Sequence, residues 1–154
     1  MSEGAARAPT AIDALVAAAR RGHPRLITRL ASGWALFGER QFVKGYTLLL
    51  PDPVVPDLNS LTADARAQFL NDMGLIGDAL LKVTAAVRIN YAIFGNLEPA
   101  LHAHIVPRYA DEPSDMRTQH PWAYDWNAAP PFDPAGCADL AAALHGELAR
   151  HGAR

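Results

Sequence analysis

The chain has 154 residues, of which half are apolar and 19% are charged, and its formal net charge at pH 7 is −2. This length favours one domain, so we expect residues 1–154 to form a single unit. The net negative charge disfavours a nucleic-acid polymer as partner, because neutralising a phosphate backbone normally requires a basic face.

Cysteine usage and the N-terminal sequence bear on the cellular compartment. Cys137 is the only cysteine, which excludes an internal disulfide and favours a reducing environment. The N-terminus MSEGAARAPTAIDALVAAARRGHP lacks a basic segment followed by a long apolar run, and no stretch reaches the roughly 18 apolar residues of a membrane span. We therefore expect a cytoplasmic protein with no membrane partner.

The first third of the chain predicts one helix followed by three strands. Residues 11–21 have apolar side chains at helical spacing, with Thr10 as the N-cap and Gly22 and Pro24 as stops. Residues 1–24 are therefore expected to form an N-terminal helical extension. The short apolar runs LITRLA, WALFG and GYTLLLP then predict three strands in a meander.

A proline-rich connection, PDPVVPDLNS, leads into a long predicted helix that is capped by Thr62. Its apolar stripe consists of Phe69, Met73, Ile76, Leu80 and Val83. Two strand-like runs, VRINYAIFG and LHAHIVPRY, complete a core over residues 25–110. Residues 111–154 are expected to form an ordered surface loop rich in proline and tryptophan, followed by a short helix near Cys137 to Arg150.

The order of these elements predicts an α+β fold. We expect a mainly antiparallel sheet of about five strands, with the long helix packed on one face and shorter helices at the ends.

Two histidines share one face of the last predicted strand. Alternate side chains of a strand project to the same side, so His102 and His104 stand next to each other. The side chains that alternate with them project the other way, into the core: Leu101, Ala103 and Ile105. Imidazole titrates near neutral pH, so one neutral ring can attack phosphorus while a protonated neighbour steadies a phosphate or a leaving group. The pair therefore predicts phosphoryl transfer.

A His-x-His pair by itself also fits half of a metal site or two surface histidines. A zinc site needs a third ligand, and position 100, the next place on the same face, is alanine. The other candidate ligands are distant in the sequence: Glu98, Asp111 and His120. We expect no metal, and a metal-binding or purely structural protein remains an alternative hypothesis.

The segment GNLEPALHAHIVPRY resembles the signature of the histidine triad (HIT) superfamily, His-x-His-x-His followed by apolar residues and often ending in Val-Pro-Arg. GYTLLLPDPV, followed by a helix, is similar to the central strand and connection of that family, so the resemblance covers roughly residues 25–110. Within the superfamily, the chain resembles the diadenosine polyphosphate hydrolase-like branch. The resemblance implies a HIT-like fold and a twofold homodimer.

By this resemblance, His102 is the nucleophile that attacks the alpha phosphorus of a dinucleoside polyphosphate or related nucleotide. A covalent nucleotidyl-histidine forms, which water or another acceptor resolves, while His104 contacts the phosphate and the leaving group. Asn90 and Asn96 fall where the family uses amides or hydroxyls around the nucleotide, although strand-end and turn roles explain them equally well. Arg108 is a candidate either for polyphosphate binding or for a solvated strand end. No cofactor is implied beyond a divalent cation carried by the nucleotide.

The resemblance also places Trp34 and Phe37 near the base pocket, with core packing as the alternative explanation. The chain departs from the family pattern at two positions. Ala100 replaces the first histidine of the triad, and Tyr46 stands where many relatives carry a histidine behind the nucleophile. Loss of one supporting group predicts turnover lowered by about 10- to 100-fold. The alternative is a nucleotide-binding protein with weak or no turnover.

Overall fold

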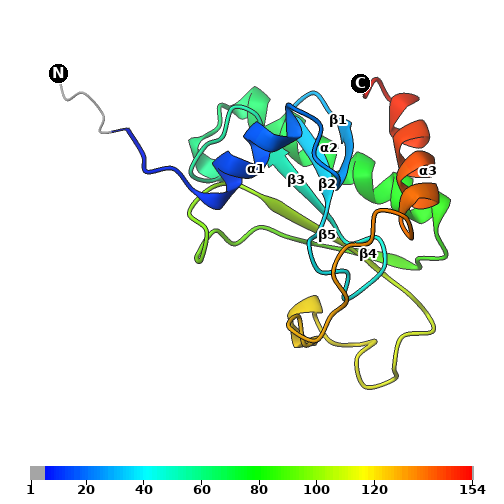
Figure 1. The fold of residues 1–154 in the computed structure, drawn as a ribbon. Coiled ribbons are helices and arrows are strands. Elements are labelled where there is room, and N and C mark those ends of the chain that lie inside the picture. Colours follow the sequence, from blue (N-terminus) through cyan, green and yellow to red (C-terminus); the bar gives the residue numbers. More distant parts are fainter. Residues whose placement is uncertain (1–5, 154) are drawn as a thin grey trace.

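The computed structural model describes residues 6–153, which form a five-stranded antiparallel sheet, three α-helices and two short 3-10 helices (Figure 1). The α-helices are α1 (Ala11–Ala19), α2 (Ala63–Val83) and α3 (Ala138–Ala149), and the 3-10 helices are η1 (Leu58–Ser60) and η2 (Pro121–Ala123). The strands are β1 (Leu26–Arg29), β2 (Gly33–Phe37), β3 (Thr47–Pro51), β4 (Arg88–Ala92) and β5 (Ala103–Arg108). The predicted α+β class is confirmed. Residues 1–5 of the expected N-terminal extension, and Arg154, lie outside the described residues.

β5, the strand of the histidines, lies inside the sheet between β3 and β4. The strand order is β1-β2-β3-β5-β4, so the first three strands form the predicted meander. His104 is paired with Leu48 of β3 on one side and with Ala92 of β4 on the other. An interior strand is hydrogen-bonded along both edges. The backbone that holds His104 is therefore fixed from both sides.

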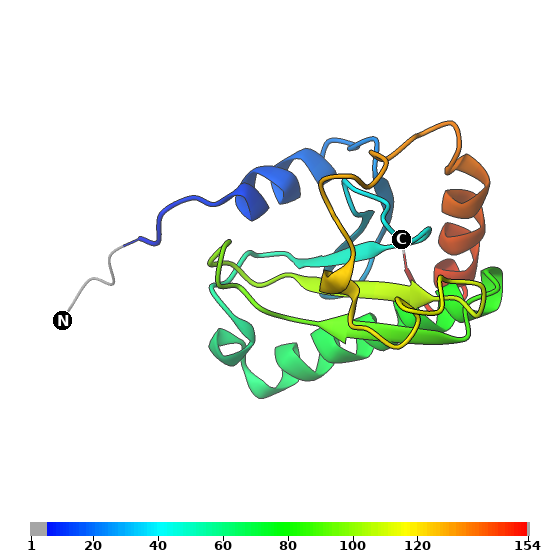
Figure 2. The same cartoon turned by 90° about the horizontal axis from the view of Figure 1, so that it is seen from below.

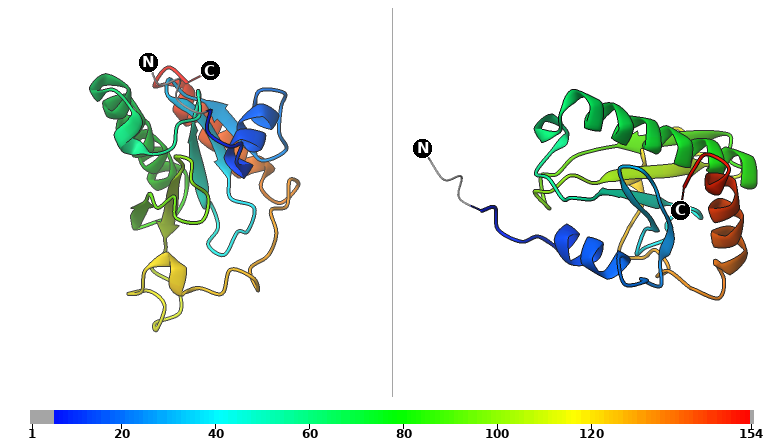
Figure 3. Two further views of the ribbon diagram at one scale, coloured as in Figure 1. Left: turned by 90° about the vertical axis from the view of Figure 1, so that its left-hand side faces the viewer. Right: turned by 90° about the horizontal axis from the view of Figure 1, so that it is seen from above.

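The two faces of the sheet pack against different helices, and Figure 3 shows α2 and α1 on opposite sides of it. Along β5, Ala103 and Ile105 belong to a core shared with α2 and α3. Val106, together with Leu48 of β3, belongs to a second cluster that includes residues of α1. Because side chains alternate along a strand, His104 projects to the same side as Val106.

α2 forms as the sequence predicts. The hydroxyl of Thr62 accepts a hydrogen bond from the N–H of Ala65, at 3.2 Å. The buried carboxylate of Asp72 accepts the N–H and the hydroxyl of Ser32, which ties α2 to the turn between β1 and β2. α2 has 21 residues, yet none of the helices within residues 6–153 combines the length and the apolar character that crossing a membrane requires. The buried members of the predicted stripe are Phe69, Met73, Ile76 and Leu80, and Val83 is partly buried.

The shorter helices lie close to their predicted bounds. α1 begins with a reciprocal capping box between Thr10 and Asp13, and it ends at Ala19 rather than at residue 21 because the chain turns after the C-cap Arg20. α3 buries three leucines at helical spacing against α2 and β1: Leu140, Leu144 and Leu148.

Gly33, at the start of β2, leaves no room for a side chain. A Cβ atom there would lie 1.8 Å from the Leu50 carbonyl oxygen, so β2 and β3 would have to separate. We predict that Gly33→Ala destabilises the protein by about 1–3 kcal/mol. Gly146 in α3 has nothing within 4 Å of its Cβ position, so Gly146→Ala should stabilise by about 0.4–1 kcal/mol. Urea unfolding followed by circular dichroism measures both changes, and a Gly33→Ala protein as stable as wild type would contradict the argument.

Candidate active site

His102 and His104 stand side by side on the sheet face that is turned away from α2. Their ring centroids are 4.9 Å apart and the ring planes are inclined by 70°. His104 lies in β5 and His102 immediately precedes the strand. Both side chains are half-buried rather than sealed in the core. We call these two residues the histidine pair.

The backbone fixes which nitrogen of His102 is free. The Nδ1 of His102 lies 2.8 Å from the carbonyl oxygen of Ala100. A carbonyl only accepts hydrogen bonds, so Nδ1 carries the proton and donates it, and in the neutral ring the Nε2 lone pair remains available. This support comes from the main chain at position 100, so it does not require a histidine side chain there.

His104 is held from behind by Tyr46. The Tyr46 hydroxyl lies 2.7 Å from His104 Nδ1, and the two rings are almost parallel. Burial lowers the pKa of His104 from 6.5 to about 4, with a smaller contribution from His102. Burial also raises the pKa of Tyr46, so the phenol keeps its proton. The phenol donates to Nδ1, and the His104 proton then sits on Nε2 as a donor toward the site.

The hydrogen bond of Tyr46 and the burial of His104 correct two interpretations that the sequence suggested. The resemblance placed Tyr46 behind the nucleophile, whereas its hydroxyl bonds to His104 rather than to His102. The pattern also suggested a protonated neighbour for the attacking imidazole. His104 is instead neutral at pH 7, because burial disfavours its charged form. The pair therefore combines a free nitrogen lone pair with a neutral N–H donor.

Close packing in the β2–β3 loop keeps Tyr46 in place. A Cβ atom on Gly38 would lie 2.1 Å from two carbon atoms of the Tyr46 ring, so the ring fits only against a glycine. The Tyr46 carbonyl accepts the N–H of Gly38 and the side-chain amide of Gln41, both at 2.9 Å. The orientation of His104 thus depends on a loop that precedes it by about sixty residues in the chain.

Aromatic residues from two separate segments contact His104. Phe94, in the turn after β4, and Trp122, in η2, have ring centroids 6.1 and 5.0 Å from the imidazole. Trp122 meets Phe94 edge-on at 4.8 Å and stacks on Trp126 at 5.2 Å. We call Phe94, Trp122 and Trp126 the aromatic wall. The sequence predicted only a surface loop before the last helix, and the one signal for this role was the tryptophan content of that loop.

Arg108 is bound within the protein, so it is neither free to bind a polyphosphate nor a solvated strand end. It is buried, and each of its three nitrogen atoms donates to protein oxygens, which belong to Asn90, Glu112, Met116 and Gln119. A buried guanidinium in this network has no free N–H group to offer a ligand. Arg108 therefore anchors the segment after β5, which Figure 2 shows crossing over the sheet.

The two asparagines lie in different environments. The side-chain oxygen of Asn90, Oδ1, accepts a hydrogen bond from Arg108 at 2.8 Å, which leaves the side-chain NH₂ group as a donor. Asn96 is exposed in the loop before the histidine pair, and no side-chain hydrogen bond joins it to another of the residues 6–153. Of the two, only Asn90 has a side-chain hydrogen bond within residues 6–153 that orients it.

Trp34 and Phe37 have packing roles, which was the alternative explanation for them. Phe37 is completely buried and stacks on Phe132, with a centroid separation of 5.3 Å. The indole N–H of Trp34 donates to Asp52, and Arg29 covers its ring. The aromatic groups in contact with His104 are instead Tyr46, Phe94 and Trp122.

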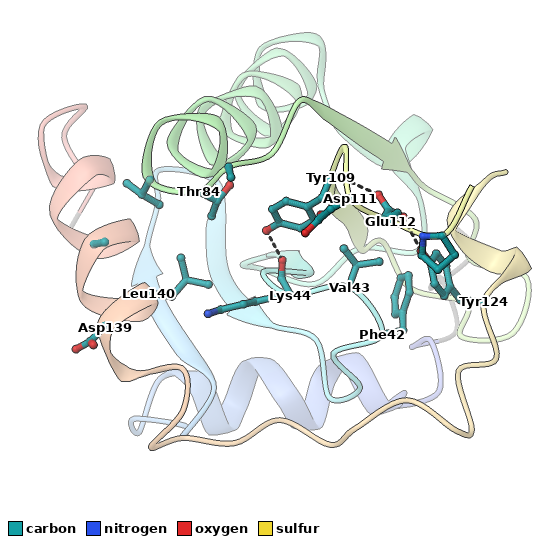
Figure 4. Close-up of a pocket in the computed structure, with 14 residues that line it drawn as sticks. Phe42, Val43, Lys44, Thr84, Tyr109, Asp111, Glu112, Tyr124, Asp139 and Leu140 are labelled. Carbon is teal, nitrogen blue, oxygen red and sulfur yellow. Dashed lines mark hydrogen bonds between the residues drawn. The ribbon is translucent and has the colours of Figure 1, made fainter. Parts of the chain in front are cut away.

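Two large cavities differ in their relation to the histidine pair. One, of about 740 Å³, lies between the β2–β3 loop, the end of α2 and the start of α3, and Figure 4 shows Lys44 and Tyr109 at its centre, joined by a hydrogen bond. Its lining includes neither histidine. The other, of about 940 Å³, runs along β4 and is bordered by Phe94 and Trp122. Of these two cavities, only the second is lined by side chains that contact His104, namely Phe94 and Trp122.

The ligands considered for a metal are not gathered together. Within residues 6–153, no three His, Cys, Asp or Glu side chains are close enough to hold one ion. His120 lines the cavity along β4, and the Glu98 carboxylate accepts the N–H of Ala11.

An antiparallel sheet whose inner strand presents two adjacent imidazoles is the architecture of the histidine triad class. The HIT domain family matches residues 34–111, half of the chain, and the chain belongs to the HIT family. Members of this family are nucleotide-binding proteins, hydrolases or transferases. A comparison with curated proteins found no match.

Solved structures share the fold over most of the chain. A histidine triad protein from Bradyrhizobium japonicum is 23% identical with a TM-score of 0.70, over 79% of this chain and 88% of that one. A histidine triad protein from Marinobacter aquaeolei is 17% identical with a TM-score of 0.70, over 85% and 94%. A hypothetical histidine triad nucleotide-binding protein from Sulfolobus tokodaii is 14% identical with a TM-score of 0.68, over 89% and 92%. At these identities the likeness establishes the fold alone.

The depressed pKa of His104 has a consequence for stability. The unfolded chain takes up a proton at this residue near pH 6.5, and the folded protein only near pH 4, so stability falls as the pH decreases between these values. We predict that wild type loses about 2 kcal/mol more than His104→Asn between pH 7 and pH 5. Urea unfolding at both pH values measures this difference. The comparison cancels His23, whose pKa is also lowered by burial and is common to both proteins. Equal losses in the two proteins would refute the prediction.

Proposed function

We propose that the protein is a nucleotide hydrolase or transferase that acts at the alpha phosphorus of a dinucleoside polyphosphate or related nucleotide through a covalent nucleotidyl-histidine. The observation that supports this proposal best is the hydrogen bond from His102 Nδ1 to the Ala100 carbonyl, which leaves Nε2 free beside a second imidazole. An uncharged imidazole with its other nitrogen held in this way is a competent nucleophile near neutral pH.

In the first step, the Nε2 lone pair of His102 attacks the alpha phosphorus and a P–N bond forms. The bond from phosphorus to the bridging oxygen breaks, and its electron pair leaves with the second phosphate. The ring then carries a positive charge, which the hydrogen bond from Nδ1 to the Ala100 carbonyl stabilises. In the second step, water or another hydroxyl attacks the same phosphorus, the P–N bond breaks, and its electron pair returns to Nε2 while a proton passes to solvent.

The neutral state of His104 favours a phosphate as the leaving group. With a pKa of about 4, His104 holds no extra proton near pH 7 and acts as a hydrogen-bond donor to phosphate oxygen. A phosphate departs as an anion and needs no proton, whereas an amine leaving group needs one. The required charge neutralisation is assigned to a divalent cation carried by the nucleotide. We propose no further cofactor. We also propose a cytoplasmic location, because nucleotides are abundant there.

The second candidate function is nucleotide binding with weak or no turnover. The alanine at position 100 favours it, because this side chain supplies no imidazole to the pair. The Ala100 carbonyl nevertheless orients His102, and for this reason we place the enzyme first.

The test uses diadenosine polyphosphates and adenosine phosphoramidate with wild type and His102→Ala. Chromatography follows the products, and intact-protein mass spectrometry of quenched reactions follows the covalent adduct. We expect wild type to form products and the adduct from the diadenosine polyphosphates, and to act more slowly on adenosine phosphoramidate, whose amine leaving group needs a proton. His102→Ala should lose the adduct and lower turnover by more than about 1000-fold. His151→Ala, which removes an exposed histidine after α3, serves as the matched control. Turnover that survives in His102→Ala contradicts the mechanism, and binding without products selects the second candidate.

We also propose that the protein is a homodimer. The outer side of α2 exposes Leu70 and Leu81, which are 44% and 43% accessible and lie on one side of the helix, and Tyr91 on the neighbouring edge strand β4 is 45% accessible. Exposed apolar side chains next to an open sheet edge favour association with a second copy.

Sedimentation equilibrium tests the homodimer. Wild type should sediment as a dimer, and the double variant Leu70→Asp, Leu81→Asp should sediment as a monomer, because two charges would be buried in the interface. Ala142→Asp on the exposed side of α3 controls for the added charge. A monomeric wild type, or a double variant that remains dimeric, argues against this surface.

A further inference from the structure

Phe94 is an exposed aromatic side chain in contact with a candidate catalytic residue. It is 56% accessible, yet its ring lies 6.1 Å from the His104 imidazole and 4.8 Å from Trp122. The phosphate chemistry proposed above places the substrate against the two imidazoles and involves no contact between the substrate and the aromatic wall. Exposed aromatic surface beside a reactive site commonly marks the place where a ligand binds.

The aromatic wall continues into the cavity of about 940 Å³ along β4. Phe94 and Trp122 line this cavity together with Asn90 and residues 118–121. None of its lining residues is Lys, Arg, Asp or Glu. The cavity therefore suits an uncharged group with a flat apolar face, and the Asn90 NH₂ group is available to donate to a polar atom on its edge.

Trp122 is held in position from behind. Its ring stacks on Trp126, which packs against Phe42 of the β2–β3 loop with a centroid separation of 4.0 Å. The segment that contains both tryptophans is tied down by Arg108 and by the hydrogen bond from the Tyr124 hydroxyl to Glu112. An aromatic ring that is already fixed loses little conformational entropy when a ligand stacks on it.

We propose that Phe94 and Trp122 bind a planar aromatic group of the substrate while its phosphate lies at the histidine pair, and so determine substrate specificity. This inference rests on the proposed function for the position of the phosphate. The planar group is supplied either by the nucleobase or by an aromatic leaving group, since both present the same face for stacking.

Two pairs of compounds separate these sources. The β-phenyl and β-cyclohexyl esters of ADP carry a planar and a non-planar six-membered ring, respectively, on the leaving phosphate. The β-methyl esters of ADP and of ribose 5-diphosphate differ only in the presence of the base. We expect kcat/KM of wild type to favour the planar member of at least one pair by about 5- to 100-fold. The pair that shows the preference identifies the source.

Substitutions assign the preference to the aromatic wall. Trp122→Leu keeps an apolar side chain without a ring and should reduce the preference to about twofold or less, while Trp122→Phe keeps a ring and should retain most of it. Phe94→Leu should reduce it partly. Leu97→Ala, which trims a 94% accessible side chain in the same loop as Phe94, should leave the preference unchanged.

Calorimetric binding of the same compounds to His102→Ala separates this inference from the proposed function. This protein lacks the nucleophile, so affinity is measured without turnover, and the planar compound should bind about 5- to 100-fold more tightly. If wild type turns over no compound but His102→Ala with an intact wall shows this affinity difference, the catalytic proposal fails and the aromatic site stands. If planar and non-planar compounds bind equally, or if adding Trp122→Leu weakens all compounds by the same factor, the aromatic site is wrong.

Discussion

Strict alternation of side chains along β5 is the constraint on which the rest of the structure depends. Leu101, Ala103 and Ile105 are fully or almost fully buried on the α2 side, so the intervening residues, His102 and His104, must face the other way. Pairing of His104 with both Leu48 and Ala92 locks this register from two sides. A slip of one residue would bury both imidazoles in the core and expose the apolar set, which makes the alternative register unfavourable.

The sheet fixes the direction of the two imidazoles, and their surroundings determine what each one does. His102 is oriented by a backbone carbonyl, which any residue at position 100 supplies. His104 is enclosed by Tyr46 and by the aromatic wall, and burial lowers its pKa until the neutral form dominates at pH 7. Two chemically identical side chains, less than 5 Å apart, are thus assigned a lone pair and an N–H donor.

The segment between β5 and α3 joins the fold to the site. Arg108 is the last residue of β5 and donates hydrogen bonds to the carbonyls of Met116 and Gln119. The end of the histidine strand therefore holds the following loop. That loop returns across the sheet and places Trp122 against His104. An arginine that resembles a phosphate ligand in the sequence has instead a positioning role, because burial with several carbonyl acceptors uses its donors within the protein.

The sequence by itself determined the elements and the adjacency of His102 and His104, because helical spacing, capping by Thr10 and Thr62, and alternation along a strand are local properties. Only the tertiary structure decided that Tyr46 supports His104, that Arg108 is saturated, and that Trp122 rather than Trp34 borders the site. Each of these contacts joins residues that no local period relates, and a loop of irregular backbone has no repeating pattern from which its path could be predicted. The charge state of His104 was likewise decided only by the tertiary structure, because the ring becomes buried only when distant segments pack around it.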